Sequence, residues 1–354
     1  MLIAFSIALL ASLGMTIPVR QLALHLGMLD RPGPRKVHGA PVPLLGGLAI
    51  YFGFVLAAMI AVQAPSRAQM VGILAGATML AIVGFLDDGK LLHHQVKLFI
   101  GMPLAALFLI FSGIRAQLFT SFVHGATGIF LDGCLTILWV VGITASFSIL
   151  DHMDGLCAGV AAIAAAFFTI DAGLNGQILV RTLAAATFGA ALGFLRWNFT
   201  PAKIFMGDSG AMFLGFLMAT LGLKIRPENS RGAIHWLVPL LILGAALFDT
   251  TLVSISRSRR GLIPFTSPGK DHAAHRLANL GLGTRGAVLV MYALGVCFGV
   301  LGLLVQFATP SQTLTIVGGI LLAVLLAVYF LENAPFEHQK RIEERATDPV
   351  SGSF

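Results

Sequence analysis

The stretch AQMVGILAGATMLAIVGFL, residues 68–86, has no charged side chain and is long enough to cross the apolar interior of a membrane as a helix. A helix that spans a bilayer needs about 20 mostly apolar residues. A transmembrane strand would be shorter and would alternate apolar with polar residues, which this stretch does not do. The run therefore predicts a transmembrane helix that ends at the charged pair Asp87 and Asp88.

Apolar runs of this kind recur along the whole chain. Hydrophobic residues make up 57% of it and charged residues only 11%, whereas about 25% of the residues of a soluble domain are charged. We therefore predict an all-α polytopic membrane protein with about eleven transmembrane helices. A single catalytic domain spans residues 1–331, and a polar cytoplasmic tail follows over 332–354. The runs fall at 2–19, 42–64, 68–86, 98–118, 128–149, 156–171, 177–195, 210–224, 235–255, 286–307 and 312–331.

The basic residues predict how the chain is oriented. Seventeen of the 23 Lys and Arg fall on one side of the predicted membrane and six on the other. Loops rich in Lys and Arg stay in the cytoplasm, so we expect the N-terminus outside and the C-terminus inside. The same rule accounts for the net charge of +7 without nucleic acid as a partner. The six are Arg67, Arg115, Arg181, Lys224, Arg226 and Arg231.

Two further features have simple interpretations. The first apolar run has no preceding basic segment and no cleavage site before a soluble domain, so we expect it to stay as a membrane span. The cysteines Cys134, Cys157 and Cys297 lie in apolar stretches without paired spacing, which is typical of packing residues.

Polar side chains gather on the predicted cytoplasmic side. Loops on the opposite side such as QAPSRAQ and QFATPSQT are bland by comparison. This asymmetry predicts one composite site on the cytoplasmic face. The segments that would build it are RPGPRKVH, DDGKLLHHQVK, LDHMDG, RWNFTPAKIFMGDSG and SPGKDHAAHRL.

Two pairs of carboxylates are the first candidates. Asp87 and Asp88 repel each other at the end of an apolar run, so they favour either water or a cation. Asp151 and Asp154 are three residues apart, a spacing that puts both carboxylates on one face if the segment is helical. A solvated helix end and a short acidic loop remain the alternatives.

Asp208 is the fifth carboxylate and precedes an apolar run. Its side chain, or that of Ser209, can cap the helix that starts there. The unpaired amides and positive dipole at such a helix start can instead hold a phosphate or orient a carboxylate toward a metal.

Two basic segments complete the set. His272, His275 and Arg276 combine residue types that suit a pyrophosphate and its metal. Zinc is an alternative for the two histidines, but the spacing offers no third ligand, and an interfacial basic helix is another. Lys36 and His38 suit either a substrate anion or the membrane surface. Five carboxylates and several cations on one face indicate Mg²⁺-assisted phosphoryl transfer.

The chain resembles the polyprenyl-phosphate N-acetylhexosamine-1-phosphate transferases of the WecA/MraY type, glycosyltransferase family 4. The motifs occur in the family's order between about residues 30 and 285. WNFTPAKIFMGDSG is the most specific match, and GFLDDGKLLHHQVKL resembles the family's Asp-Asp motif with its following lysine, here Lys97. The other matching segments are RKVHGAPVPLLGG, SFSILDHMDGLCAG and DHAAHRL.

This resemblance implies a reaction. The phosphate of undecaprenyl phosphate would attack the sugar-bearing phosphate of a UDP-N-acetylhexosamine and release UMP, the first membrane step of cell-envelope glycan synthesis. We expect Mg²⁺ as cofactor, with Mn²⁺ as a substitute, and N-acetylglucosamine as the sugar. The site would face the cytoplasm from the plasma membrane, and a homodimer fits the family.

The resemblance also suggests roles for individual residues. Asp208 would be a metal ligand, and Asp87 and Asp88 would be catalytic, either handling the lipid phosphate or assisting its deprotonation. The remaining residues would bind the nucleotide sugar or hold the site around it. They are Lys36, His38, Lys97, Asp151, Asp154, Asn198, His272, His275 and Arg276.

The chain departs from the family pattern at four positions. Ala145 and Ser148 stand where the family has asparagines, His152 replaces a glycine, and Ala274 replaces the middle histidine of the last motif. A weakened family member that acts as a scaffold is therefore one alternative. A secondary transporter is another, although transporters place ionisable residues near the midplane and often have internal repeats, which are absent here.

Overall fold

The chain folds almost entirely into helices. The computed structural model describes residues 1–31, 40–62, 67–226, 236–263 and 269–334. Each of the eleven apolar runs contains a helix. The helices that match them are α1 (Leu2–His25), α2 (Gly46–Ala61), α3 (Arg67–Asp88), α5 (Met102–Phe111), α6 (Ala126–Leu150), α7 (Leu156–Leu174), α8 (Ile178–Asn198), α9 (Gly207–Lys224), α10 (Leu237–Ile242) with α11 (Gly244–Arg259), α13 (Gly283–Val305) and α14 (Pro310–Glu332).

Short elements join these helices. They are β1 (Leu29–Asp30), β2 (Val42–Pro43), α4 (His94–Val96), η2 (Lys97–Gly101), η3 (Phe119–Ser121), α12 (Ala273–Leu277) and η5 (Ala278–Leu282). The predicted tail begins inside α14, which ends at Glu332, and residues 335–354 lie outside the described part of the chain.

Seven helices within the described residues are long and apolar enough to cross a membrane. The segments Gly46–Ala61 and Lys97–Phe111 are apolar but shorter. Because a helix satisfies all its backbone hydrogen bonds internally, it is the structure that such apolar runs adopt in lipid. The prediction of an all-α, multi-pass membrane protein is confirmed. The seven are Leu2–His25, Ala68–Asp88, Ala126–Leu150, Leu156–Leu174, Ile178–Asn198, Ala273–Val305 and Pro310–Glu332.

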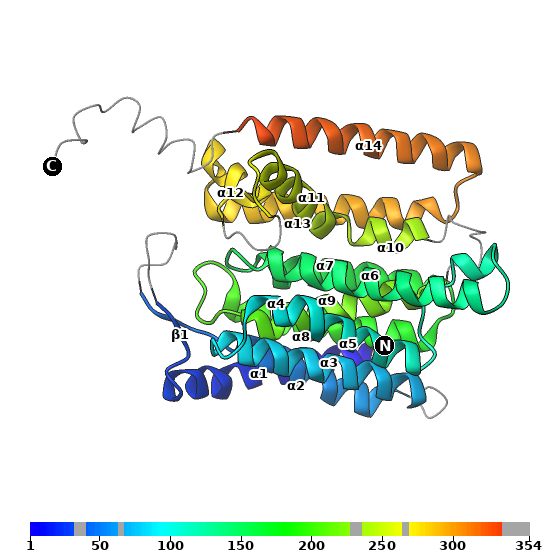
Figure 1. Cartoon of the computed structure of the whole chain (residues 1–354). Helices are drawn as coiled ribbons and strands as arrows, with labels where there is room; N and C mark the ends of the chain where they lie inside the picture. Colours follow the sequence, from blue (N-terminus) through cyan, green and yellow to red (C-terminus); the bar gives the residue numbers. More distant parts are fainter. Residues whose placement is uncertain (32–39, 63–66, 227–235, 264–268, 335–354) are drawn as a thin grey trace.

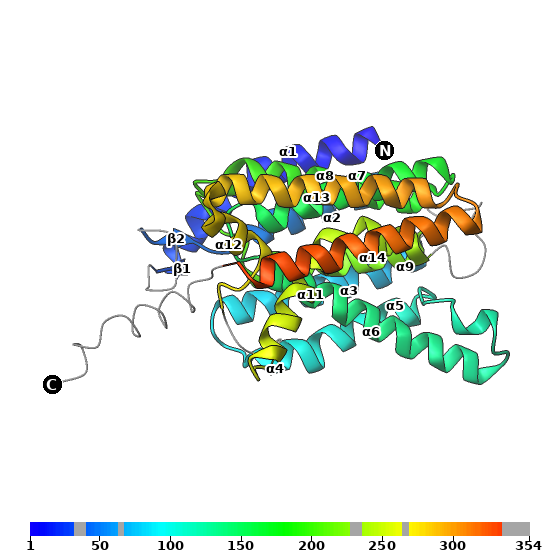
Figure 2. The ribbon, with the colours of Figure 1, turned by 90° about the horizontal axis from the view of Figure 1, so that it is seen from above.

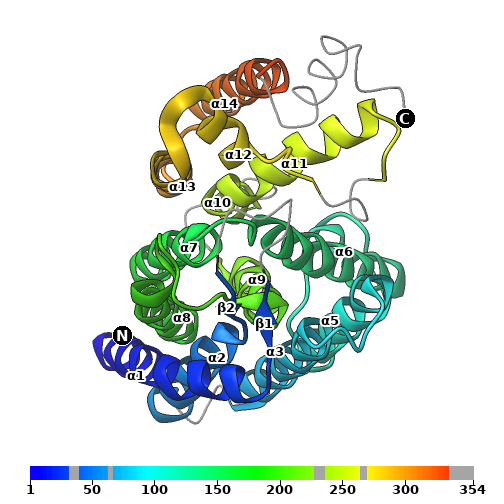
Figure 3. The ribbon, with the colours of Figure 1, turned by 90° about the vertical axis from the view of Figure 1, so that its left-hand side faces the viewer.

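Helix α9 lies at the centre of the N-terminal part. Figure 3 shows it enclosed by a ring of α1, α2, α3, α5, α6, α7 and α8. Only Asp208 and Lys224, near the two ends of α9, are not fully buried. Small residues allow neighbouring helices to approach closely in a membrane protein. A side chain on Gly47 of α2 would collide with the backbone of Gly210, and one on Gly84 of α3 with the backbone of Asp208.

The C-terminal helices form a second group on one side of this ring. α13 packs against α7 and α10, and α11 packs against α6. α14 is the outermost helix in Figure 1, and side chains such as Leu322 and Leu325 are exposed on it, as expected for a surface that faces lipid. Helix α12 lies at the same end of the bundle as β1 and β2 in Figures 1 and 2.

A two-stranded ribbon ties the chain to the start of α9 at this end. β1 pairs antiparallel with β2. The backbone N–H of Phe205 donates to the carbonyl of Pro43, and the N–H groups of Gly46 and Gly47 donate to the carbonyls of Phe205 and Met206. These bonds place the start of α2 beside the turn that precedes Asp208.

Candidate active site

Asp88 joins the end of α3 to the start of α9. Its two carboxylate oxygens accept hydrogen bonds from the backbone N–H groups of Asp208, at 2.8 Å, and of Ser209, at 3.1 Å. The first amides of a helix have no partner within the helix, so a carboxylate there satisfies them and interacts favourably with the helix dipole. Gly207 has a positive φ of 73°, and a side chain on it would collide with the Asp88 carboxylate.

Lys97 connects the other two carboxylates of this cluster. Its Nζ atom lies 2.8 Å from Oδ2 of Asp87 and 2.6 Å from Oδ2 of Asp208. All three side chains are only partly accessible, so the ammonium group offsets two charges in a place where water screens them little. The structure thus brings together residues that are more than a hundred positions apart in the sequence.

Asp151 and Asp154 lie in the turn between α6 and α7, not on a helix. Burial, with the neighbouring charges of Asp208, Asp88 and Asp154, raises the pKa of Asp151 to about 8. Asp154 instead binds the loop between α8 and α9, where its Oδ2 accepts a hydrogen bond from the backbone N–H of Ala202 at 2.9 Å. Asp151 is therefore the member of the pair that belongs to the acidic cluster.

Asn198 holds two loops together. Its Oδ1 accepts from the N–H of Gly155 at 3.0 Å, and its Nδ2 donates to the carbonyl of Ile204 at 2.9 Å. The side chain is buried. The Tyr292 hydroxyl also donates to the carbonyl of Gly155, at 2.5 Å. Of the two roles expected for Asn198, this geometry supports holding the site rather than contacting a nucleotide.

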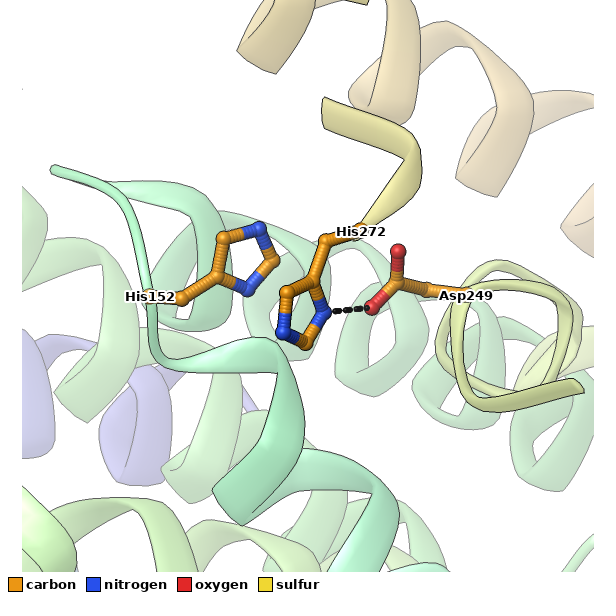
Figure 4. Close-up of side chains that lie close together, drawn as sticks. All are labelled: His152, Asp249 and His272. Atoms are coloured by element: carbon orange, nitrogen blue, oxygen red, sulfur yellow. Dashed lines mark hydrogen bonds and ion pairs between the residues drawn. The ribbon is translucent and has the colours of Figure 1, made fainter. Parts of the chain in front are cut away.

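Three histidines form a second cluster next to the acidic one. The ring of His152 stacks on that of His272 with centroids 3.8 Å apart. The centroid of the His275 ring lies 4.8 Å from that of His152. Nδ1 of His272 donates to Oδ2 of Asp249 at 2.9 Å (Figure 4). The other oxygen of Asp249 accepts from the N–H of Ala273 at 2.7 Å. His152 follows Asp151 directly, so the two clusters adjoin.

Arg276 lies at the edge of this site and is fully buried. Its guanidinium donates to the carbonyls of Asp271 and Leu331, to the hydroxyl of Ser256 and to the carboxylate of Glu332. These contacts tie α12 to α11 and α14. Arg276 was predicted to bind substrate, but the structure shows it engaged with the protein itself.

Some polar residues of this region were not predicted. Asp249 and Arg257 lie on α11, where no motif marks them. Asp271 accepts a bidentate pair from Arg257 at 2.9 and 3.0 Å and a further contact from Arg260, and these cations hold its pKa well below the usual range despite the opposing effect of burial. A carboxylate inside an otherwise apolar run is the signal that could have revealed Asp249. Lys36 and His38 lie outside the described residues.

The donor set of the acidic cluster fits a hard divalent cation. Asp87, Asp88, Asp151 and Asp208 offer carboxylate oxygens, the ligand type that Mg²⁺ and Mn²⁺ prefer. Both oxygens of Asp88 already accept backbone hydrogen bonds. Asp208 and Asp87 share the ammonium group of Lys97 through their Oδ2 atoms, and Asp151 has a raised pKa that a cation would lower.

Comparison with known proteins yields a consistent group of relatives. The profile described as glycosyl transferase family 4 matches residues 70–226. The chain is 36% identical over 319 residues to the probable undecaprenyl-phosphate N-acetylglucosaminyl 1-phosphate transferase of Bacillus subtilis, covering 89% of this chain and 87% of that protein.

Two more distant relatives have similar names. The decaprenyl-phosphate N-acetylglucosaminephosphotransferase of Mycobacterium tuberculosis is 34% identical over 78% of this chain and 75% of its own length. The undecaprenyl-phosphate alpha-N-acetylglucosaminyl 1-phosphate transferase of Escherichia coli K12 is 26% identical over 89% of this chain and 86% of its own length.

Proposed function

The chain belongs to glycosyl transferase family 4, and from that premise we propose that it transfers N-acetylglucosamine-1-phosphate from UDP-N-acetylglucosamine to undecaprenyl phosphate and releases UMP. The names of the relatives support the sugar and the polyprenyl phosphate acceptor. One structural observation carries the proposal. Lys97 joins Asp87 to Asp208 and thereby unites two separate motifs in one partly accessible site at the end of the bundle.

The reaction is an in-line displacement at the sugar-bearing phosphorus. An oxygen of the acceptor phosphate forms the new P–O bond, and the bond to the UMP oxygen breaks. A phosphate monoester has a second pKa of about 6, so it is already largely ionised at neutral pH and needs little help from a general base. The protein therefore contributes chiefly by positioning the two anions and offsetting their charge.

Each residue of the acidic cluster has a distinct part in this scheme. Asp88 fixes the start of α9, and Lys97 holds Asp87 and Asp208 and offers positive charge to a phosphate oxygen. Asp208, with Asp87 and Asp151, would hold Mg²⁺. When bound there, the ion supplies positive charge that neutralises the pyrophosphate and stabilises the leaving UMP.

The histidine cluster would bind the other side of the donor. His272 and His275 lie beside the acidic cluster, where the pyrophosphate or the sugar of the donor would bind. Arg276 would position these histidines, because its hydrogen bonds to α14 hold the helix that carries His275. Asp154 and Asn198 keep the neighbouring loops in place.

The finer topology is part of the same proposal. We infer eleven spans, with the N-terminus outside and the C-terminus in the cytoplasm of a plasma membrane. Besides the seven long helices, α2, α5, α9 and the pair α10 and α11 would each cross together with their flanking residues. The excess of Lys and Arg in the loops at the site end supports this orientation. The site would then face the cytoplasm, where UDP-sugars are made.

An assay of UMP release tests the proposal. Purified protein with Mg²⁺, undecaprenyl phosphate and UDP-N-acetylglucosamine should produce UMP and a lipid-linked sugar, and Asp208→Ala should abolish both. Absence of UMP with every UDP-N-acetylhexosamine, while a related enzyme works in parallel, would exclude the transferase. Protein-dependent solute flux into vesicles without UMP release would favour the transporter instead.

A further inference from the structure

His152 is the centre of the histidine cluster. It lies in the turn between α6 and α7, and its ring contacts the rings of both His272 and His275, which are 6.0 Å from each other. The spacing of His272 and His275 in the sequence offers two ligands for a transition metal but no third. The structure adds an imidazole from a segment 120 residues away.

Hydrogen bonds determine which nitrogen carries the proton on two of these rings. Nδ1 of His152 lies 3.2 Å from the carbonyl oxygen of Ile149, which can only accept, so this nitrogen is the donor. Nδ1 of His272 likewise donates to the carboxylate of Asp249. In the neutral ring, Nε2 then has an available lone pair.

This arrangement matches the surroundings of histidines that bind metals. Such a histidine nearly always donates its second ring N–H to a carboxylate or a backbone carbonyl, which fixes the ring and increases its basicity. Asp249 serves His272 in this way and Ile149 serves His152. Nε2 of His152 is buried and has no hydrogen-bond partner among the described residues.

The distances are close to those that a metal requires. The ligand atoms of His152, His272 and Asp249 all lie within 4.8 Å of one another. Two nitrogens on one tetrahedral Zn²⁺ lie about 3.4 Å apart, because each Zn–N bond is about 2.0–2.1 Å long. The rings of His152 and His272 are stacked, so they would have to turn for their lone pairs to meet on one ion. Figure 4 shows the ring of His152 beside that of His272, with Asp249 on the opposite side of His272.

We propose that His152, His272 and His275 form a second metal site, which binds Zn²⁺ or a similar transition metal ion. Imidazole nitrogens favour such ions, whereas the neighbouring carboxylates favour Mg²⁺. Three histidines leave a fourth position open to water or to an oxygen of a bound anion. The metal would tie the turn between α6 and α7 to α12 and so link the two groups of helices.

Metal binding to the intact, detergent-purified protein tests this proposal without any substrate. After chelation, the protein is titrated with Zn²⁺ and, for its visible spectrum, with Co²⁺, in excess Mg²⁺ that occupies the carboxylates. We expect one ion per chain and a Co²⁺ spectrum typical of nitrogen ligands. His152→Gly and His275→Ala should each lower the affinity at least tenfold, and Asp249→Asn ten- to a hundredfold.

A control variant and a stability measurement make the test decisive. His124 is an exposed histidine in the loop before α6, and His124→Ala should bind Zn²⁺ like the unchanged protein. Zn²⁺ should raise the melting temperature of the unchanged protein but not that of His152→Gly. If no Zn²⁺ binds above the Mg²⁺ background, or if His152→Gly binds it equally well, the proposal is wrong. None of these measurements depends on UMP release, so their outcome tests the metal site independently of the proposed function.

Discussion

Oδ1 of Asp88 lies 2.8 Å from the backbone nitrogen of Asp208, so the carboxylate at the end of α3 caps helix α9, whose first turn carries the proposed metal ligand. Its second oxygen accepts from Ser209 at 3.1 Å. With both oxygens engaged, Asp88 acts by positioning α9. In the proposed function, Asp87 and Asp208, which share Lys97, are the carboxylates that would meet substrate and metal.

Substitution of Asp88 should therefore lower the stability of the protein as well as its transferase activity. Loss of a helix cap costs about 0.5–2 kcal/mol. We expect Asp88→Ala to lower the unfolding free energy by that amount and Asp88→Asn, which keeps one acceptor oxygen, to lower it less. Thermal unfolding in detergent measures both. Equal melting temperatures for Asp88→Ala and the unchanged protein would contradict the capping role.

Lys97 should be needed for turnover more than for folding. Removal of one electrostatic contact to a transition state typically costs about 100- to 1000-fold in rate. We expect Lys97→Met to lower the rate of UMP release by about that factor, while the protein stays folded. Lys90 is exposed in the turn after α3, seven residues before Lys97, so Lys90→Met is the matched control. A loss of the same size in both variants would show a general effect of loop charge instead.

Asp151 should make the metal-free protein sensitive to pH. Folding raises the pKa of its carboxyl from 3.8 to about 8, so the folded state favours the protonated form. The resulting stabilisation is complete below about pH 4 and is lost as pH rises through 8. Without divalent cations, the melting temperature should fall between pH 5 and about pH 9, and Asp151→Asn should flatten this decline. An unchanged decline in Asp151→Asn would assign the pH dependence to other groups.

Asn198 should prove structural. Its side chain makes two hydrogen bonds in a buried place, and each buried polar group left without a partner costs about 1–3 kcal/mol. Asn198→Ala should therefore lower the unfolding free energy by at least about 2 kcal/mol, while the KM for UDP-N-acetylglucosamine of the folded fraction changes little. A large rise in KM without loss of stability would restore the nucleotide-binding role.

The proposed sites were only partly accessible to sequence reasoning. Asp87, Asp88 and Asp208 stand out because a charge at the end of an apolar run is costly and rare. Asp249 lies inside such a run and carries the same signal, but no motif surrounds it, and only the fold shows that its carboxylate contacts His272. Arg276 was assigned to the substrate because its charge is visible in the sequence, whereas the protein groups that bind it come from α11, α14 and Asp271.

The sequence by itself determined that the protein is surrounded by lipid, which class of fold it adopts and to which family it belongs. A chain with so few charged residues can be covered only by lipid, and lipid allows little besides helices. The resemblance of several motifs in order then identified the relatives. Tertiary structure alone decided which oxygens and nitrogens meet. Contacts such as that of Lys97 with Asp208, or of His152 with His272, join segments more than a hundred residues apart. They depend on how closely α2 and α3 approach α9, which the glycines at those crossings permit.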